Sequence, residues 1–283
     1  MISFVMNDHD CLKALLQVIK NGLVEGNVQA FAAGILSKIP SSDDNLNRLM
    51  TTENVLPALV KMVSGKNLEG QANALGTLVR FTDSSDVQSQ RSLIELDLVL
   101  SLRQALKDGT VPAKIWACRI LENISRSTTK LSREPNKWGF KLSRKTSLNC
   151  KLHKGKCSLK DCIVEAGVVP DIVETLENQN PEVVLAGLKA LETLLLEENM
   201  LEDGIQILYK CKAIDQLFPL VHLDSHTCSE KCVDLLEVIL RFPHMKGAYG
   251  QLVQRSLAAV SACRVPSLRQ KARKLLRQLT IPS

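Results

Sequence analysis

The chain has 283 residues, of which 45% are hydrophobic and only 4% aromatic. Leu, Val, Ile and Ala fill most apolar positions, which suits packing of helix on helix, and so few aromatic residues argue against the stacking platforms of single-strand nucleic-acid binders. The net charge of +6 is segregated: residues 127–160 hold ten Lys or Arg and one acid, residues 251–283 hold seven and none, and the remainder carries −10. We therefore expect protein partners and no nucleic acid.

Cysteine usage and the absence of export signals indicate a reducing compartment. The nine cysteines are an odd number, and most of them fall within helical patterns. The first ten residues lack a basic start and a long apolar run, and no stretch of 18 apolar residues occurs anywhere. We expect thiols that serve as small core residues, in a protein of the cytoplasm, with the nucleus as an alternative.

One helical pattern recurs six times along the sequence. Its equivalent residue pairs are 42, 43, 70, 45 and 40 residues apart, and four of these spacings match the period of roughly 40–47 of armadillo and HEAT repeats. The pairs are Ile35-Leu36, Thr77-Leu78, Ile120-Leu121, Ala190-Leu191, Leu235-Leu236 and Leu275-Leu276. Because a single repeat cannot bury its apolar face alone, repeats stack into a solenoid with a long binding surface.

Each complete repeat is predicted to hold a short first helix, a middle helix and a long last helix. The predicted first helices span residues 45–52, 90–96, 159–166 and 204–211; the middle helices span 12–19, 56–63, 99–106, 169–176 and 214–221; and the last helices span 27–39, 68–81, 112–124, 182–196, 229–242 and 267–280. Gly22, Gly65 and Gly109 follow the first three middle helices, and we expect them to end these helices in the left-handed conformation.

Residues 127–158 interrupt the pattern with a basic segment, which we interpret as a flexible loop inserted between repeats. The predicted fold is therefore all-α: a single armadillo-repeat solenoid over residues 1–283, forming a right-handed superhelix of about six repeat units. The first repeat starts at a middle helix, so we expect the chain to be the C-terminal part of a longer protein, or else to begin with a short cap of its own.

Two groups of Cys and His residues have the composition of metal ligands. Cys150, His153, Cys157 and Cys162 lie within thirteen residues, but their spacing matches no common zinc finger. We interpret them as loop residues plus one buried thiol. The second group consists of His222, His226, Cys228 and Cys232, and there we expect packing of Cys232. We accordingly predict no metal site and no cofactor, and because no nucleotide-binding, hydrolase or metalloprotease motif occurs, no catalytic residue either.

Candidate partner-binding residues lie on the last helices. An Asn ladder of the kind used by armadillo transport receptors would need Asn at six equivalent positions, but only Asn123 fits, so binding of nuclear-import cargo is disfavoured. Trp116 could anchor a partner peptide, and basic side chains could recognise an acidic one. The candidates are Lys38, Arg80, Trp116, Arg119, Asn123 and Arg241.

The last helix is strongly basic and admits a second interpretation. Its charges either form a polar end cap or attract anionic lipid or an acidic partner, at about 1 kcal/mol per side chain near a charged membrane. A scaffold at the membrane periphery is thus the alternative function. The basic residues concerned are Arg264, Arg269, Lys271, Arg273, Lys274 and Arg277.

One short element is more specific than the repeats. The run His153-Lys-Gly155-Lys-Cys157-Ser158-Leu159, followed by Cys162-Ile-Val-Glu-Ala-Gly-Val-Val-Pro170, resembles the armadillo region of plant U-box ubiquitin ligases, in one subgroup of which a His-x-Gly-x-Cys-Ser/Thr element precedes a repeat. The resemblance implies a role in ubiquitination: in that family the U-box binds the charged conjugating enzyme and the repeats bind substrate.

The chain departs from that family because no segment like a U-box precedes its repeats. We therefore expect a module that recognises a protein substrate or adaptor in a ubiquitin ligase system and is non-catalytic by itself.

Overall fold

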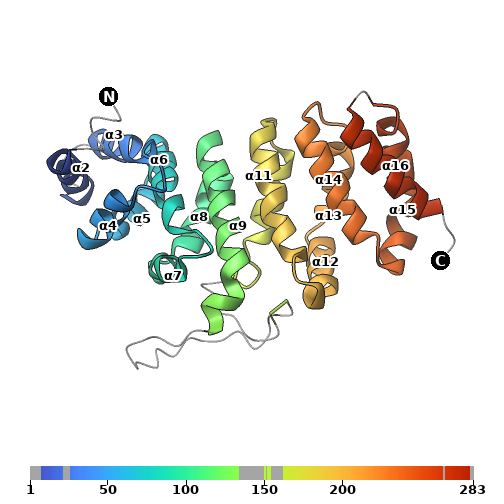
Figure 1. Cartoon of the computed structure of the whole chain (residues 1–283), viewed down its shortest axis with the longest axis horizontal. Coiled ribbons are helices and arrows are strands. Elements are labelled where there is room, and N and C mark those ends of the chain that lie inside the picture. Colours follow the sequence, from blue (N-terminus) through green and yellow to red (C-terminus); the bar gives the residue numbers. More distant parts are fainter. Residues whose placement is uncertain are drawn as a thin grey trace. The chain divides into compact units, whose positions relative to one another are not determined.

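The computed structural model describes residues 8–21, 26–133, 150, 152–153, 162–263 and 265–280, and within these ranges it contains helices and turns but no strand (Figure 1). The contacts between residues divide the chain into two compact units, residues 1–171 and 172–283, and the boundary falls inside one short helix. The single continuous solenoid remains a prediction, so each unit is described by itself.

Unit 1 is built from the predicted first, middle and last helices. Its last helices stack in sequence, α3 on α6 and α6 on α9, and the middle helices α2, α5 and α8 pack beneath them. The elements are α2 (His9–Asn21), α3 (Gly26–Ser37), α4 (Asp44–Thr52), α5 (Leu56–Val63), α6 (Leu68–Leu78) with the 3-10 turn η1 (Val79–Phe81), α7 (Val87–Glu95), α8 (Leu98–Asp108), α9 (Val111–Arg133) and α10 (Val169–Glu174), which crosses into unit 2.

Unit 2 repeats the arrangement, with α14 packed between the last helices α11 and α16. Figure 1 shows these three helices side by side. The elements are η2 (Thr175–Glu177), α11 (Pro181–Glu192), η3 (Thr193–Leu195), η4 (Glu198–Met200), α12 (Leu201–Lys210), α13 (Ala213–Leu220), α14 (His226–Ile239), α15 (Pro243–Val260) and α16 (Pro266–Thr280).

Side-chain caps fix where several helices begin. Asp43, Asn67, Asp86 and Asn180 precede α4, α6, α7 and α11, and each side chain accepts a hydrogen bond from a backbone N–H of the first turn. Such a cap satisfies a donor that the helix itself leaves unpaired, and is worth about 1 kcal/mol.

The left-handed residues are not the predicted glycines. Gly109 has a φ of −69° and Gly65 is not left-handed, whereas Gly22 lies outside the described residues. Positive φ values occur instead at the residue that connects a first helix, or its equivalent, to the next middle helix. These residues are Asn54 (52°), Asp97 (58°), Gly167 (67°) and Lys212 (58°). The sharp turn therefore lies one connection earlier in the repeat than we predicted.

Gly167 offers a test of this turn. A methyl group added at Gly167 would meet no atom within 4 Å, so Gly167→Ala changes only the backbone preference. We expect it to lower the free energy of unfolding by about 1–2 kcal/mol in urea titrations. Gly247→Ala is the matched control: its added methyl is equally unobstructed, but Gly247 lies inside α15, where Ala is favoured by up to ~1 kcal/mol. Equal effects of the two substitutions would contradict the left-handed turn.

Three predicted segments differ from the structure. α9 continues to Arg133, so residues 127–133 of the predicted basic loop are helical, and the buried Ser127 and Thr128 bond back to carbonyls of that helix. The remaining loop residues, apart from 150 and 152–153, lie outside the described residues. Where a first helix was predicted at 159–166, residues 163–167 form a turn. α15 is one continuous helix that our prediction had left out.

Candidate partner-binding face

Polar side chains on the last helices of unit 1 tie neighbouring repeats together. Asn73 Nδ2 donates to the carbonyl of Ala30 at 3.0 Å, and the Thr77 hydroxyl donates to the carbonyl of Ala33 at 3.0 Å. Both bonds run from α6 to α3. They hold the two helices at a fixed register.

Trp116 and Arg119 form a surface pair on α9. The indole lies across α6 at Gly76, where an added Cβ would approach Trp116 Nε1 to 3.1 Å. The guanidinium carbon of Arg119 lies 5.2 Å from the centre of the Trp116 ring, within range of a cation–π interaction. Trp116 is half-buried and Arg119 is exposed. Trp116 therefore packs between repeats and also presents part of its ring to solvent.

An apolar stripe on α3 was missed by the sequence analysis. Val28, Phe31 and Ile35 are spaced by three and four residues, and their side chains are 40%, 64% and 37% exposed. One repeat further along, 42 residues on, the same positions are Gly70, Asn73 and Thr77. On α6 the equivalent positions face the neighbouring α3, with Asn73 and Thr77 bonded to it, whereas the three apolar side chains of α3 are exposed.

Arg80, a predicted binding residue, is turned inward. Only 8% of it is exposed, and its two terminal nitrogens donate to the carbonyls of Leu36 (3.1 Å) and Ile39 (2.7 Å) and to Asn47 Oδ1 (3.0 Å). Burial lowers the pKa of Arg80, and the nearby charge of Asp43 partly offsets this. Arg80 therefore caps the carbonyl end of α3 with most of its side chain buried, and its role in binding remains a prediction.

The other candidates are divided between the two units. Asn123 is half-buried and donates to the Thr82 hydroxyl at 2.9 Å, which is a structural contact. Lys38, after α3, and Arg241, after α14, are exposed. Unit 1 thus offers Lys38, Trp116 and Arg119 to a partner and unit 2 offers Arg241; their role in binding remains a prediction.

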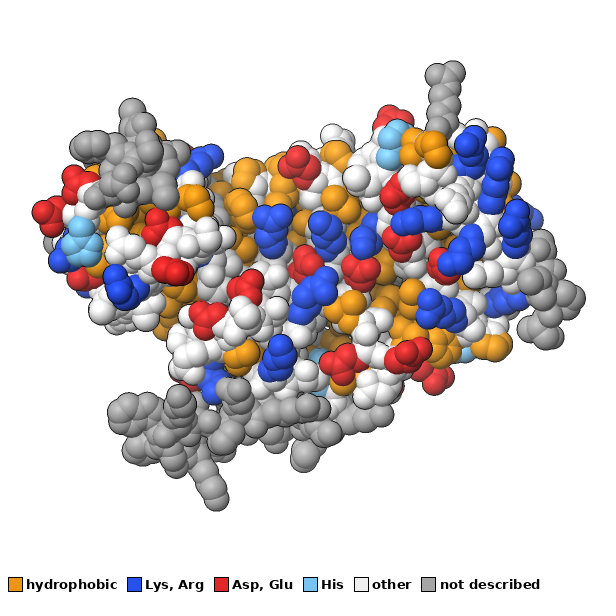
Figure 2. All heavy atoms as spheres, viewed as in Figure 1, with side chains coloured by type: hydrophobic (Ala, Val, Ile, Leu, Met, Phe, Trp, Pro, Cys, Tyr) orange, Lys and Arg blue, Asp and Glu red, His pale blue; other side chains and the backbone are white. Residues whose placement is uncertain are grey.

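In unit 2, ion pairs connect the last helices. Lys231 of α14 pairs with Glu192 of α11 at 3.0 Å. Two lysines of α16 pair with α14 at 2.7 Å each, Lys271 with Asp234 and Lys274 with Glu237, and a hydrogen bond from Lys274 lowers the pKa of Glu237. Figure 2 shows basic and acidic side chains interleaved over these helices. Exposed pairs of this kind contribute at most ~1 kcal/mol each. They therefore determine the pattern of charges on the surface of α11, α14 and α16 more than the stability of unit 2.

These pairs also bear on the alternative of membrane attachment. Two of the basic residues of α16, Lys271 and Lys274, already have carboxylate partners, and Arg264 lies outside the described residues. No described helix combines the length and hydrophobicity needed to span a bilayer. Attachment at the membrane periphery remains a prediction.

The two Cys and His groups behave differently. Cys228 and Cys232 are buried in α14, Cys228 Sγ contacts the carbonyl of Pro181 at 3.2 Å, and burial raises the pKa of Cys232. His222 and His226 are exposed, so these four residues do not form one site. In contrast, Cys150, His153 and Cys162 come together in unit 1, whereas Cys157 lies outside the described residues.

Stacked sets of first, middle and last helices define an armadillo-type α-solenoid, and comparison with solved structures confirms this class. A designed armadillo repeat protein superposes with a TM-score of 0.67 at 17% identity, over 95% of this chain and 100% of that chain. Computationally designed armadillo repeat proteins for modular peptide recognition give a TM-score of 0.69 at 18% identity, over 94% of this chain and 98% of that chain.

The relatives by sequence are U-box proteins, as the resemblance predicted. U-box domain-containing protein 44 of Arabidopsis thaliana is 27% identical over 278 residues, 89% of this chain, and U-box domain-containing protein 43 of the same plant is 26% identical over 287 residues, also 89%. The chain spans about a third of the length of each (35% and 34%). No family model matches the chain.

Proposed function

We propose that the chain recognises a protein substrate or adaptor in a ubiquitin ligase system and is non-catalytic by itself. The observation that carries this proposal is the set of apolar and aromatic groups that the last helices of unit 1 leave accessible. Phe31 is the most exposed of the large apolar side chains described, at 64%. Exposed apolar groups close to charged ones are typical of protein interaction surfaces.

The comparisons support a peptide-like ligand. One designed armadillo repeat protein with a TM-score of 0.68 to this chain was solved in complex with the peptide (KR)4. This chain differs in the chemistry it offers, because the accessible groups are Phe31, the Trp116–Arg119 pair and Lys38. A ligand that matches them carries an apolar side chain beside acidic residues, since Arg and Lys recognise carboxylates.

The link to ubiquitination rests on the relatives. The chain spans about a third of the length of the two U-box proteins, so the similarity supports a role in the same system but not a catalytic one. The proposed division of labour is that this chain selects the partner, and that transfer of ubiquitin is performed elsewhere.

A peptide library displayed on phage and selected on the immobilised full chain tests the recognition surface. We expect enrichment of peptides that combine an apolar residue with Asp or Glu, and a loss of affinity of about tenfold or more for the double variant Phe31→Ser, Arg119→Glu. Leu252→Ser is the matched control, because Leu252 is 43% exposed on α15, outside this surface. Enrichment that the double variant leaves unchanged would refute the proposed surface.

The ubiquitin link requires a separate measurement. Proteins that crosslink to the wild-type chain in cells, but not to the double variant, should be enriched in ubiquitin remnants on lysine when analysed by mass spectrometry. If the partners carry no ubiquitin remnants, the chain would still be a binding module, but its proposed role in a ubiquitin ligase system would be refuted.

A further inference from the structure

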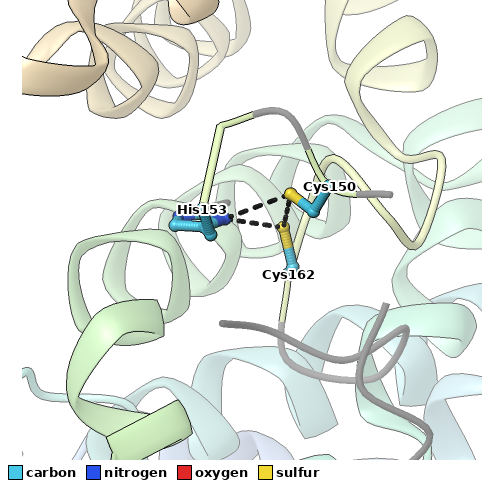
Figure 3. Close-up of side chains that lie close together, drawn as sticks. All are labelled: Cys150, His153 and Cys162. Atoms are coloured by element: carbon cyan, nitrogen blue, oxygen red, sulfur yellow. Dashed lines mark hydrogen bonds between the residues drawn. The ribbon is translucent and has the colours of Figure 1, made fainter. Parts of the chain in front are cut away.

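Three potential metal ligands converge in the interior of unit 1 (Figure 3). His153 Nδ1 lies 3.5 Å from Cys150 Sγ and 3.2 Å from Cys162 Sγ, and the two sulfur atoms are 3.9 Å apart. The exposed fractions are 2% for Cys150, 7% for His153 and 0% for Cys162. The three ligand atoms all lie within 4.8 Å of one another, and a search of the described residues for groups of three or more His, Cys or acidic side chains this close finds this group.

The triangle of ligand atoms has the size of one face of a zinc tetrahedron. With Zn–S bonds of about 2.3 Å and Zn–N bonds of about 2.0–2.1 Å, tetrahedral angles place neighbouring ligand atoms about 3.6–3.8 Å apart. The observed separations of 3.2, 3.5 and 3.9 Å bracket this range. Small shifts of the side chains would therefore place the three ligand atoms at three corners of a tetrahedron, and a water molecule or a further ligand would take the fourth position.

Hydrogen bonding alone does not account for the arrangement. A neutral imidazole nitrogen offers either one N–H or one lone pair, so His153 Nδ1 can make one good hydrogen bond, yet it faces two sulfur atoms. A divalent cation would satisfy all three groups at once.

The fold holds these ligands in place from both sides. Cys162 begins a closed turn, in which its carbonyl accepts from Ala166 N at 2.9 Å and Ile163 O accepts from Val168 N at 3.1 Å. Ile163 and Val168 are buried, at 1% and 0% exposure, and they anchor the turn in the core. Cys150 and His153 are three residues apart in the chain, and the buried Leu152 lies between them in the sequence. Ligands fixed in advance lower the cost of binding a metal.

We propose that Cys150, His153 and Cys162 bind a Zn²⁺ ion that fixes this part of unit 1. The turn of residues 163–167 occupies the place of the first helix that other repeats have, and a turn buries less apolar surface than a helix. A metal would supply the missing stabilisation, as it does in small domains with little core of their own. This site is independent of the partner-binding surface and of any ubiquitin chemistry.

Zinc suits these three side chains better than another metal ion or a disulfide bond does. Two thiolates and an imidazole are common ligands of Zn²⁺, whereas Mg²⁺ and Ca²⁺ prefer oxygen. A disulfide between Cys150 and Cys162 would leave His153 with no role, and structural disulfides are rare in reducing compartments.

The metal content of the full chain tests the proposal. The protein is purified under reducing conditions without chelators and analysed by inductively coupled plasma mass spectrometry for Zn, Cu, Fe and Ni. We expect about one zinc per chain, falling at least tenfold in Cys150→Ser, His153→Ala and Cys162→Ser. Cys11 is a half-buried cysteine of α2 outside the triangle, so the control variant Cys11→Ser should retain the metal. Copper or iron in place of zinc, or zinc that survives all three substitutions, would overturn the proposal.

Two measurements on the wild-type chain guard against variants that fail to fold. Titration of the metal-stripped, reduced chain with Co²⁺ should produce the visible absorption bands of tetrahedral cobalt, and Zn²⁺ should displace them. Removal of zinc by excess chelator should lower the thermal midpoint by several degrees, and added Zn²⁺ should restore it. If the reduced wild-type chain shows neither the cobalt spectrum nor a zinc-dependent midpoint, the three residues do not form a zinc site.

Discussion

Leu121→Ala is expected to lower the free energy of unfolding by about 2–5 kcal/mol, the range for deletion of a fully buried leucine. Leu121 has 0% exposure in α9, as do its neighbours Ile120 and Ile124, so the substitution leaves a cavity lined by side chains that cannot all relax into it. Urea denaturation followed by circular dichroism measures the loss. The unfolding transition that includes α9 is the one to compare.

Leu100→Ala provides the control for this prediction. Leu100 lies on the neighbouring α8 and is 51% exposed, so the same atoms are removed without a cavity, and we expect a change within about 0.5 kcal/mol. A near-neutral result at Leu121 would mean that the helical register of α9, and with it the alignment of the repeats, is wrong.

The long helices were predictable because their apolar residues recur with helical period. In α16, for example, Leu268, Ala272, Leu275 and Leu279 form one stripe, and all four are buried. The repeat spacing then aligned one helix with the next, and the solved armadillo structures confirm the class. Local periodicity and the need of each repeat to bury its apolar face are both present in the sequence itself.

The connections were harder to predict because their conformations depend on packing. Asn54, Asp97 and Lys212 adopt left-handed backbone angles at a cost of roughly 1–2 kcal/mol each. At the fourth such position, Gly167, the sequence has glycine, the residue that usually marks a left-handed turn. The helices on either side impose the turn. Likewise, α15 runs as one helix through residues 243–260, where no helix was predicted, and its glycines, Gly247 and Gly250, do not interrupt it.

Side-chain positions at the candidate sites were also hard to predict, because they too depend on packing. Sequence spacing placed Trp116 on α9 and Arg80 at the end of the preceding last helix, in η1, but it could not show that the long Arg80 side chain turns back to carbonyls of α3. Nor could spacing show that Cys150, His153 and Cys162 meet, because their separation along the chain matched no common finger and the turn that brings Cys162 to the others was predicted as helix.

Arg80→Met is expected to lower the free energy of unfolding by about 2–4 kcal/mol. Methionine fills much of the same volume but donates no hydrogen bond, so the carbonyls of Leu36 and Ile39 and the Asn47 side chain lose their donor. Hydrogen bonds to charged groups contribute about 1.5–3 kcal/mol, and a buried carbonyl left unpaired adds its own cost. Arg80→Lys should recover only part of the loss, because one ammonium cannot reproduce the fork of the guanidinium.

Arg48→Met is the control that separates stability from binding. Arg48 is exposed on α4, so we expect its replacement to change stability by less than about 0.5 kcal/mol. In the peptide selection, folded Arg80→Met should enrich the same sequences as the wild type, because the guanidinium faces the carbonyl end of α3 and not the solvent. A stable Arg80→Met variant that selects different peptides would restore Arg80 to the binding surface. The opposite outcome, lower stability with unchanged selection, would leave recognition in unit 1 to Phe31, the Trp116–Arg119 pair and Lys38.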